Sequence, residues 1–280
     1  MNKPRYINAG GRLIDLNIPK VMGIINITPD SFYSGSRISG AEATVAAVGR
    51  MIADGADIID IGGYSSRPGA PELPAEEEEK RVLPAIKLIR NEFPETVISV
   101  DTYRAAIAEK AVVEYGVHIV NDISGGDADP EMFKVISKTK VPYIMMHMQG
   151  RPGTMQDAPQ YNDVVSDILK YFGERIFKLR SAGVSDIIID PGFGFGKTTE
   201  HNFDILHRLE DFAIAGLPLL VGLSRKTMIW KTLGITPEDA LAGTIALNTA
   251  ALMKGADIVR VHDVKEAIQA VKLVCRIKNL

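Results

Sequence analysis

Short apolar runs recur along the chain, separated by polar loops and longer amphipathic segments. Eight of these runs have the length and the β-branched content of strands that are buried on both faces, as in a parallel sheet. These predicted strands are Val21–Thr28, Ile58–Gly63, Val97–Thr102, His118–Ser124, Val141–Met148, Ile187–Asp190, Leu219–Ser224 and Ile258–Asp263. Helical segments alternate with them, and a short hairpin with the turn Ala9-Gly10-Gly11 precedes the first strand.

This alternation predicts the fold. Eight strands with a helix after each indicate an α/β protein, a (β/α)8 TIM barrel with a short N-terminal β-hairpin. No linker-like or low-complexity segment interrupts the pattern, so we expect a single domain over residues 1–280. A doubly wound sheet is the alternative, but it needs a dinucleotide fingerprint after the first strand. The sequence reads Asn26-Ile-Thr-Pro29 there, which favours the barrel.

Composition narrows the class of protein. Of the 280 residues, 46% are hydrophobic and 24% are charged, and the net charge is −3 without a basic block. This argues against a nucleic-acid surface, and no apolar run is long enough to span a bilayer. The N-terminus has no hydrophobic region of the signal-peptide type, and the only cysteine, Cys275, excludes an internal disulfide. We therefore expect a soluble cytoplasmic protein without nucleic-acid or membrane partners.

Polar residues and glycines gather at the ends of the predicted strands, where TIM barrels carry their active sites. These ends hold Asn26, Gly62 with Gly63, Asp101, Asn121, His147, Asp190, Ser224 with Lys226, and Arg260 with His262. Because all eight strands contribute, we expect the side chains to converge on one pocket.

The chemistry of this rim divides by charge. Asp101, Asn121 and Asp190 offer acceptors and an amide, which suit a flat heterocycle with amino and ring N–H groups. Lys226, Arg260 and His262 suit an oxyanion or a phosphate. Asn26 is a candidate oxygen ligand for a Mg²⁺ that also holds phosphate oxygens. A Schiff base on Lys226 is an alternative.

Two other kinds of site are not predicted. Gly194-Phe-Gly-Lys-Thr198 resembles the end of a P-loop, but Pro191 occupies the position of its first glycine. The five histidines lack the His-Glu-x-x-His spacing of zinc hydrolases.

The polar segments together resemble the motifs of the dihydropteroate synthase family, in the same order and over nearly the whole chain. The matching segments are Asn26-Ile-Thr-Pro-Asp-Ser-Phe32, Asp60-Ile-Gly-Gly-Tyr-Ser-Ser-Arg-Pro-Gly69, Ser99-Val-Asp-Thr102, Asn121-Asp-Ile-Ser-Gly125, Asp190-Pro-Gly-Phe-Gly-Phe-Gly-Lys197, Gly222-Leu-Ser-Arg-Lys226 and Arg260-Val-His262. The resemblance implies a transferase of folate biosynthesis. Such an enzyme joins 6-hydroxymethyl-7,8-dihydropterin pyrophosphate to p-aminobenzoate, giving 7,8-dihydropteroate and pyrophosphate.

The resemblance also implies roles for individual residues. A pterin deep in the barrel would contact Asp101, Asn121, Met145, Asp190 and Lys226. Pyrophosphate would be held by Asn26, Arg67, Arg260 and His262, with Mg²⁺ on Asn26. The p-aminobenzoate pocket, shared with sulfonamides, would be formed by Phe32, Ser66, Arg67, Pro68, Phe195 and Thr227. Catalysis would depend on Asn26, Lys226, Arg260 and His262. The family resemblance further implies a homodimer built through barrel helices far from the site.

Three positions depart from the usual pattern of the family. Ser34 replaces an acid two residues after Phe32, Ser66 replaces a threonine, and Thr227 replaces a serine. Two alternative functions stay open: a pterin-binding methyltransferase that serves a corrinoid partner, and a paralogue that binds pterin without catalysis.

Overall fold

Eight parallel strands form the central barrel of the chain, seen in a computed structural model that describes residues 6–27, 37–64, 73–150, 155 and 159–280. The strands are β3 (Lys20–Asn26), β4 (Ile58–Gly62), β5 (Val97–Asp101), β6 (Ile119–Asp122), β7 (Tyr143–Met146), β8 (Ile187–Asp190), β9 (Leu220–Val221) and β10 (Ile258–Val261). Their order is β8-β7-β6-β5-β4-β3-β10-β9. A parallel bridge between Ile189 and Leu219 joins the first strand of this order to the last. The predicted (β/α)8 barrel is confirmed.

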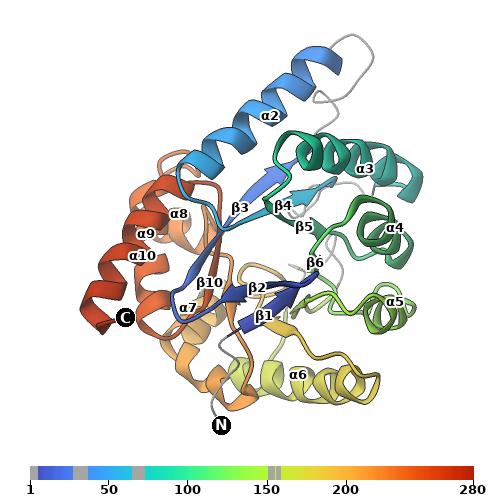
Figure 1. Cartoon of the computed structure of the whole chain (residues 1–280). Helices are drawn as coiled ribbons and strands as arrows, with labels where there is room; N and C mark the ends of the chain where they lie inside the picture. Colours follow the sequence, from blue (N-terminus) through green and yellow to red (C-terminus); the bar gives the residue numbers. More distant parts are fainter. Residues whose placement is uncertain (1–5, 28–36, 65–72, 151–154, 156–158) are drawn as a thin grey trace.

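Helices lie outside the strands and cover the barrel (Figure 1). They are α2 (Arg37–Ala53), α3 (Ala75–Glu92), α4 (Ala105–Tyr115), α5 (Met132–Thr139), α6 (Val164–Ser181), α7 (Thr199–His207), the 3-10 helix η1 (Leu209–Ala215), α8 (Thr227–Leu233), α9 (Leu241–Met253) and α10 (Val264–Lys278). Within the described residues, none of the helices is both long enough and apolar enough to cross a membrane.

The amino-terminal end of the barrel is filled with apolar side chains. One buried residue from each strand enters a single cluster, formed by Met22, Ile58, Val97, Ile119, Ile144, Ile188, Leu220 and Ile258. The predicted hairpin, β1 (Tyr6–Ala9) paired antiparallel with β2 (Arg12–Asp15), adds three buried residues to this cluster, and Leu16 just after β2 adds a fourth. Figure 1 shows the hairpin lying across the strands. Because the hairpin closes this end, ligands reach the interior from the opposite end.

A second layer of inward-facing residues follows two positions further along the strands. Side chains alternate along a strand, so residues two apart share a face. This layer is mostly polar: Asp60, Ser99, Asn121, Asp190 and Arg260. The neighbouring outward-facing residues, such as Ile59 and Val100, belong to the large cluster between strands and helices. Alternation therefore places charge inside the barrel while the outer faces of the same strands stay apolar.

Candidate active site

Arg260 of β10 lies between two carboxylates from other strands. Its Nε donates to Asp60 Oδ2 at 2.6 Å, and its Nη2 donates to Asp101 Oδ2 at 2.7 Å. Burial alone would lower the pKa of Arg260, but the negative charges of Asp60 and Asp101 outweigh it and raise that pKa. The guanidinium is therefore a permanent cation at the floor of the pocket.

Asp60 also orients the amide of Asn121. The Asn121 Nδ2 group donates to Asp60 Oδ2 at 3.0 Å, so the amide nitrogen faces β4. Asp60 is completely buried, and its Oδ1 has no hydrogen-bond partner among the described residues. Sequence reasoning gave Asp60 no role, although a carboxylate between Ile59 and Ile61 inside an apolar strand is a signal of an internal partner.

Asp101 is held by two donors. Arg260 binds Oδ2, and the Tyr64 hydroxyl donates to Oδ1 at 3.0 Å. Burial raises the pKa of Asp101 to about 7, against the opposing effects of the Arg260 cation and the Tyr64 hydrogen bond. The proton affinity of this carboxyl group thus depends on both partners.

Asp190 ends β8 at a turn that only glycine allows. Its Oδ1 accepts from the Gly192 N–H at 2.8 Å. Gly192 has a φ of +72°, and a Cβ atom there would lie 2.0 Å from the carbonyl oxygen of His147. Burial raises the pKa of Asp190, while the Gly192 N–H and the Lys226 cation oppose this shift.

Lys226 enters the pocket from the turn after β9. Arg225 has a φ of +54°, and its guanidinium pairs with both oxygens of Asp263, at 2.9 and 3.1 Å. This anchored turn leaves the Lys226 Nζ 4.1 Å from the centre of the Phe195 ring. Burial and the Arg260 cation lower the pKa of Lys226 to about 8, so the ammonium form still dominates at neutral pH.

A second buried lysine, Lys197, fixes the loop that carries Phe195. Its Nζ donates to the carbonyl oxygens of Phe195 at 3.0 Å and His147 at 3.2 Å, and lies 3.0 Å from His147 Nδ1. These contacts tie the loop after β8 to the end of β7. Sequence reasoning assigned Lys197 no role, since its acceptors are mainly backbone carbonyls that no motif reveals.

Two expectations for β7 need correction, namely Met145 as a pterin contact and His147 as a residue of the pocket. Met145 was expected near the pterin, but it belongs to the cluster between the strands and the helices. Met146, one residue on, faces inward and packs with Ile123 and Phe195. His147 lies on the same outward face of the chain as Met145, and its ring centre is 4.8 Å from that of Tyr171. Strand alternation makes Met146 the pocket-lining residue.

The remaining predicted residues lie at the carboxyl ends of the strands or outside the described part. Asn26 ends β3 and is exposed, next to Gly62 in the register. Thr227 is the first residue of α8. The residues expected in the first two loops, namely Phe32, Ser34, Ser66, Arg67 and Pro68, lie outside the described residues. In the part that the structure describes, no group of three or more His, Cys, Asp or Glu side chains could hold a metal ion.

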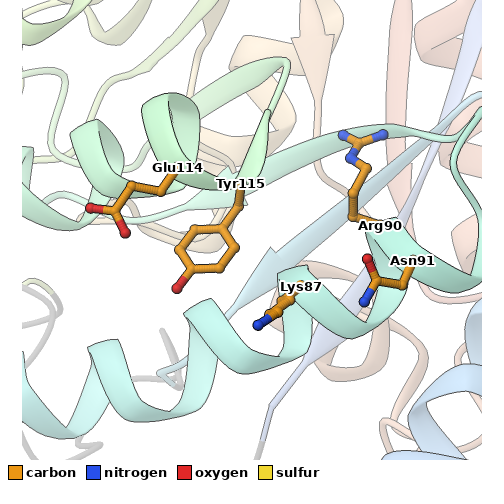
Figure 2. A pocket seen from close by; sticks show the side chains of 5 residues that line it. All are labelled: Lys87, Arg90, Asn91, Glu114 and Tyr115. Atoms are coloured by element: carbon orange, nitrogen blue, oxygen red, sulfur yellow. The ribbon is translucent and has the colours of Figure 1, made fainter.

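A separate surface pocket of about 320 Å³ lies between α3 and α4 (Figure 2). It is lined by Lys87, Arg90, Asn91, Glu114 and Tyr115. The Arg90 guanidinium donates to the carbonyl oxygens of Pro94, Thr96 and Gly116. Both helices end here just before the following strands begin, so this pocket lies at the other end of the barrel from Asp101. The Arg90 guanidinium holds neighbouring backbone segments together, so its contacts have a structural role.

His262 pairs with Ser224 at the edge of the site. The Ser224 hydroxyl lies 3.0 Å from His262 Nδ1 and accepts from the His262 backbone N–H at 3.3 Å. Partial burial and the Arg260 cation lower the pKa of His262 to about 4. The imidazole is then neutral at pH 7, and a hydroxyl that donates to Nδ1 leaves the ring proton on Nε2.

We predict that ¹⁵N NMR of the His262 imidazole shows a neutral ring at pH 7 with its proton on Nε2. The ring should titrate with a midpoint near pH 4. In the Ser224→Ala variant, which removes the hydroxyl, both neutral tautomers should be populated. A midpoint near the ordinary value of about 6.5 would contradict the assignment.

Sequence comparisons identify relatives along almost the whole chain. A sequence model of the family described as "Pterin binding enzyme" matches residues 22–262. Dihydropteroate synthase of Escherichia coli (strain K12) is 44% identical over 268 residues, which cover 95% of this chain and 94% of that protein. Dihydropteroate synthase of Haemophilus influenzae is 39% identical over 267 residues, with 95% and 96% covered.

Solved structures agree with these relatives. A Yersinia pestis dihydropteroate synthase in complex with a sulfonamide drug superposes with a TM-score of 0.91 at 39% identity, covering 98% of this chain and all of that chain. A Xanthomonas albilineans dihydropteroate synthase with 4-aminobenzoic acid has a TM-score of 0.89 at 38% identity, covering 99% of each chain. The chain therefore belongs to the dihydropteroate synthase family of pterin binding enzymes.

Proposed function

We propose that this chain condenses 6-hydroxymethyl-7,8-dihydropterin pyrophosphate with p-aminobenzoate, forming 7,8-dihydropteroate and releasing pyrophosphate. The observation that carries the proposal is the polar layer at the open end of the barrel. The buried acceptors Asp190 and Asn121 share this pocket with the cations Arg260 and Lys226, whose charges act on Asp190. A heterocycle that carries a pyrophosphate needs both kinds of group.

The acceptor side suits the pterin. The Gly192 N–H fixes one oxygen of Asp190, so the other oxygen can accept from an amino or ring N–H group. Asp60 binds the amide nitrogen of Asn121, which orients the amide oxygen as an acceptor for a ring N–H. A planar ring with several N–H groups would satisfy these buried groups, which is why we assign the deep pocket to the pterin.

The cationic side suits the leaving group. Arg260 keeps its charge at any physiological pH, and His262 offers a neutral Nε2–H donor. Both groups would bind pyrophosphate oxygens, and their hydrogen bonds strengthen as negative charge develops there. Lys226, beside Phe195, adds a further positive charge to the same side.

Asn26 can supply one of the oxygen ligands of a Mg²⁺ ion, with the others coming from the substrate and water. The exposed side-chain amide oxygen is a hard donor, but one protein oxygen does not complete an octahedral shell. Asn26 would therefore share the ion with substrate oxygens and water. When bound, Mg²⁺ supplies charge neutralisation for the pyrophosphate.

The chain's own residues would mainly bind and orient. Once the pyrophosphate charge is offset, the carbon–oxygen bond to pyrophosphate would break and leave a cation delocalised into the pterin ring. The p-aminobenzoate nitrogen would then bond to the methylene carbon, and the N–H proton it loses would pass to water or to the departing pyrophosphate. A nearby, aligned aniline nitrogen is already nucleophilic, so proximity supplies much of the acceleration and no strong base is needed. We assign Phe195 and Thr227 to the p-aminobenzoate side, with Phe32, Ser66, Arg67 and Pro68 as expected loop contributors.

The direct test is product formation by the purified chain with dihydropterin pyrophosphate and Mg²⁺. Dihydropteroate should form only when p-aminobenzoate is present.

The Lys226→Met variant should lose about a hundredfold or more in kcat/KM, as for loss of an electrostatic group in an active site. Lys231→Met is the matched control, because Lys231 is an exposed lysine on α8, the helix that follows Lys226; this variant should keep the wild-type rate.

Other outcomes identify the alternatives. Tight pterin binding without product would indicate a non-catalytic paralogue. The loss of activity would then be assigned first to Ser34, which replaces an acid of the family pattern. Methyl transfer to a corrinoid partner would indicate the methyltransferase.

Three finer properties extend the proposal. We propose that sulfonamides bind in the p-aminobenzoate pocket, so they should inhibit competitively with p-aminobenzoate. Inhibition that persists at saturating p-aminobenzoate would contradict this proposal.

We propose a homodimer through outer helices, supported by the exposed Leu273 and Ile277 of α10 and testable by light scattering. We propose a cytoplasmic location, supported by charged, water-soluble substrates.

A further inference from the structure

Tyr64 joins two parts of the pocket that the proposed reaction uses separately. Its ring packs at 5.4 Å from the Tyr103 ring and against the inward cluster of Ile123, Met146 and Phe195. Its hydroxyl reaches Asp101 Oδ1 at 3.0 Å. One side chain thus connects the apolar wall of the pocket to its charged floor.

The backbone before Tyr64 sets this direction. Gly63 follows β4 where the chain passes close to α3, and a Cβ atom there would lie 2.5 Å from Val82 Cγ2. Only glycine permits this close approach, so the next residue leaves the strand at a fixed position. Tyr64 therefore reaches the mouth of the barrel from a rigid base.

The Tyr64 hydroxyl is the donor in its hydrogen bond to the ionised Asp101 carboxylate. Burial and the Asp101 charge raise the pKa of Tyr64 well above its ordinary value, so the phenol keeps its proton and donates. Arg260 binds the other oxygen of the carboxylate. One donor on each oxygen favours a single orientation of the Asp101 carboxylate, and each oxygen keeps a further lone pair for a ligand.

We propose that Tyr64 is a positioning residue for the pterin substrate, acting through the orientation of Asp101. The inference rests on the proposed function, because Asp101 must meet the pterin for its orientation to matter. Tyr64 does not touch the reacting atoms in this account. Its effect is to hold the carboxylate in the one orientation that the ring requires.

The Tyr64→Phe variant tests this inference because it keeps the ring and removes only the hydroxyl. Titration calorimetry with dihydropterin pyrophosphate and Mg²⁺ should show binding weakened by about tenfold, the order expected for one charge-assisted hydrogen bond. The KM for p-aminobenzoate should stay within about twofold, since the hydroxyl faces Asp101.

Tyr143→Phe is the matched control. The buried Tyr143 hydroxyl donates to Asp122 Oδ2 at 2.7 Å, so this variant also removes a hydroxyl from a buried tyrosine–aspartate pair. Asp122 serves the turn at Ser124 and Gly126, outside the proposed pocket. A structural role for Tyr64 would give both variants similar losses of stability and leave pterin binding alike in both.

Two further outcomes decide the inference. In an Asp101→Asn background, Tyr64→Phe should cause little additional loss of pterin binding, because the hydroxyl acts through the carboxylate. Wild-type affinity in Tyr64→Phe, or equal losses for both substrates, would overturn the role of Tyr64 while leaving the proposed function intact. A wild-type chain that does not bind dihydropterin pyrophosphate would overturn both.

Discussion

The ion pairs of Arg260 are the interaction on which the site depends. An arginine near the centre of a barrel is stable only if its charge is compensated, and Asp60 and Asp101 provide this from two adjacent strands. The same carboxylates hold the next groups: Asp60 binds the amide of Asn121, and Asp101 binds the hydroxyl of Tyr64. Removing the central cation would therefore leave two buried carboxyl groups without their partner and loosen both neighbours.

The apolar end of the barrel gives this network its direction. Because the hairpin and the first inward layer close one end, the polar layer opens only toward the carboxyl ends of the strands. Fixed acceptors, among them Asp190, lie beside cations that remain charged, so the pocket is preorganised for a substrate with a polar ring and an anionic leaving group. The same side-chain alternation that builds the core thus builds the site.

Strand positions and most rim residues could be predicted from the sequence, because period-two patterning and polar strand ends are local signals. The pairing of Arg260 with Asp60 could not, since the two lie 200 positions apart and meet only when the barrel closes. The family resemblance implied Met145 and not Met146; adjacent methionines carry no mark of which one faces inward, and only the register decides. Tyr64 and Lys197 were missed because their partners are defined by loop geometry.

A double-mutant cycle between Asp60→Asn and Arg260→Gln, read as the free energy of unfolding, tests most directly whether this ion pair supports the site. Each single variant leaves a buried partner unsatisfied, so we expect each to be destabilised. The double variant should lose less than the sum of the two, with a coupling free energy of about 1–3 kcal/mol. Losses that add to within about 0.5 kcal/mol would show that the two residues act independently, and would contradict the account.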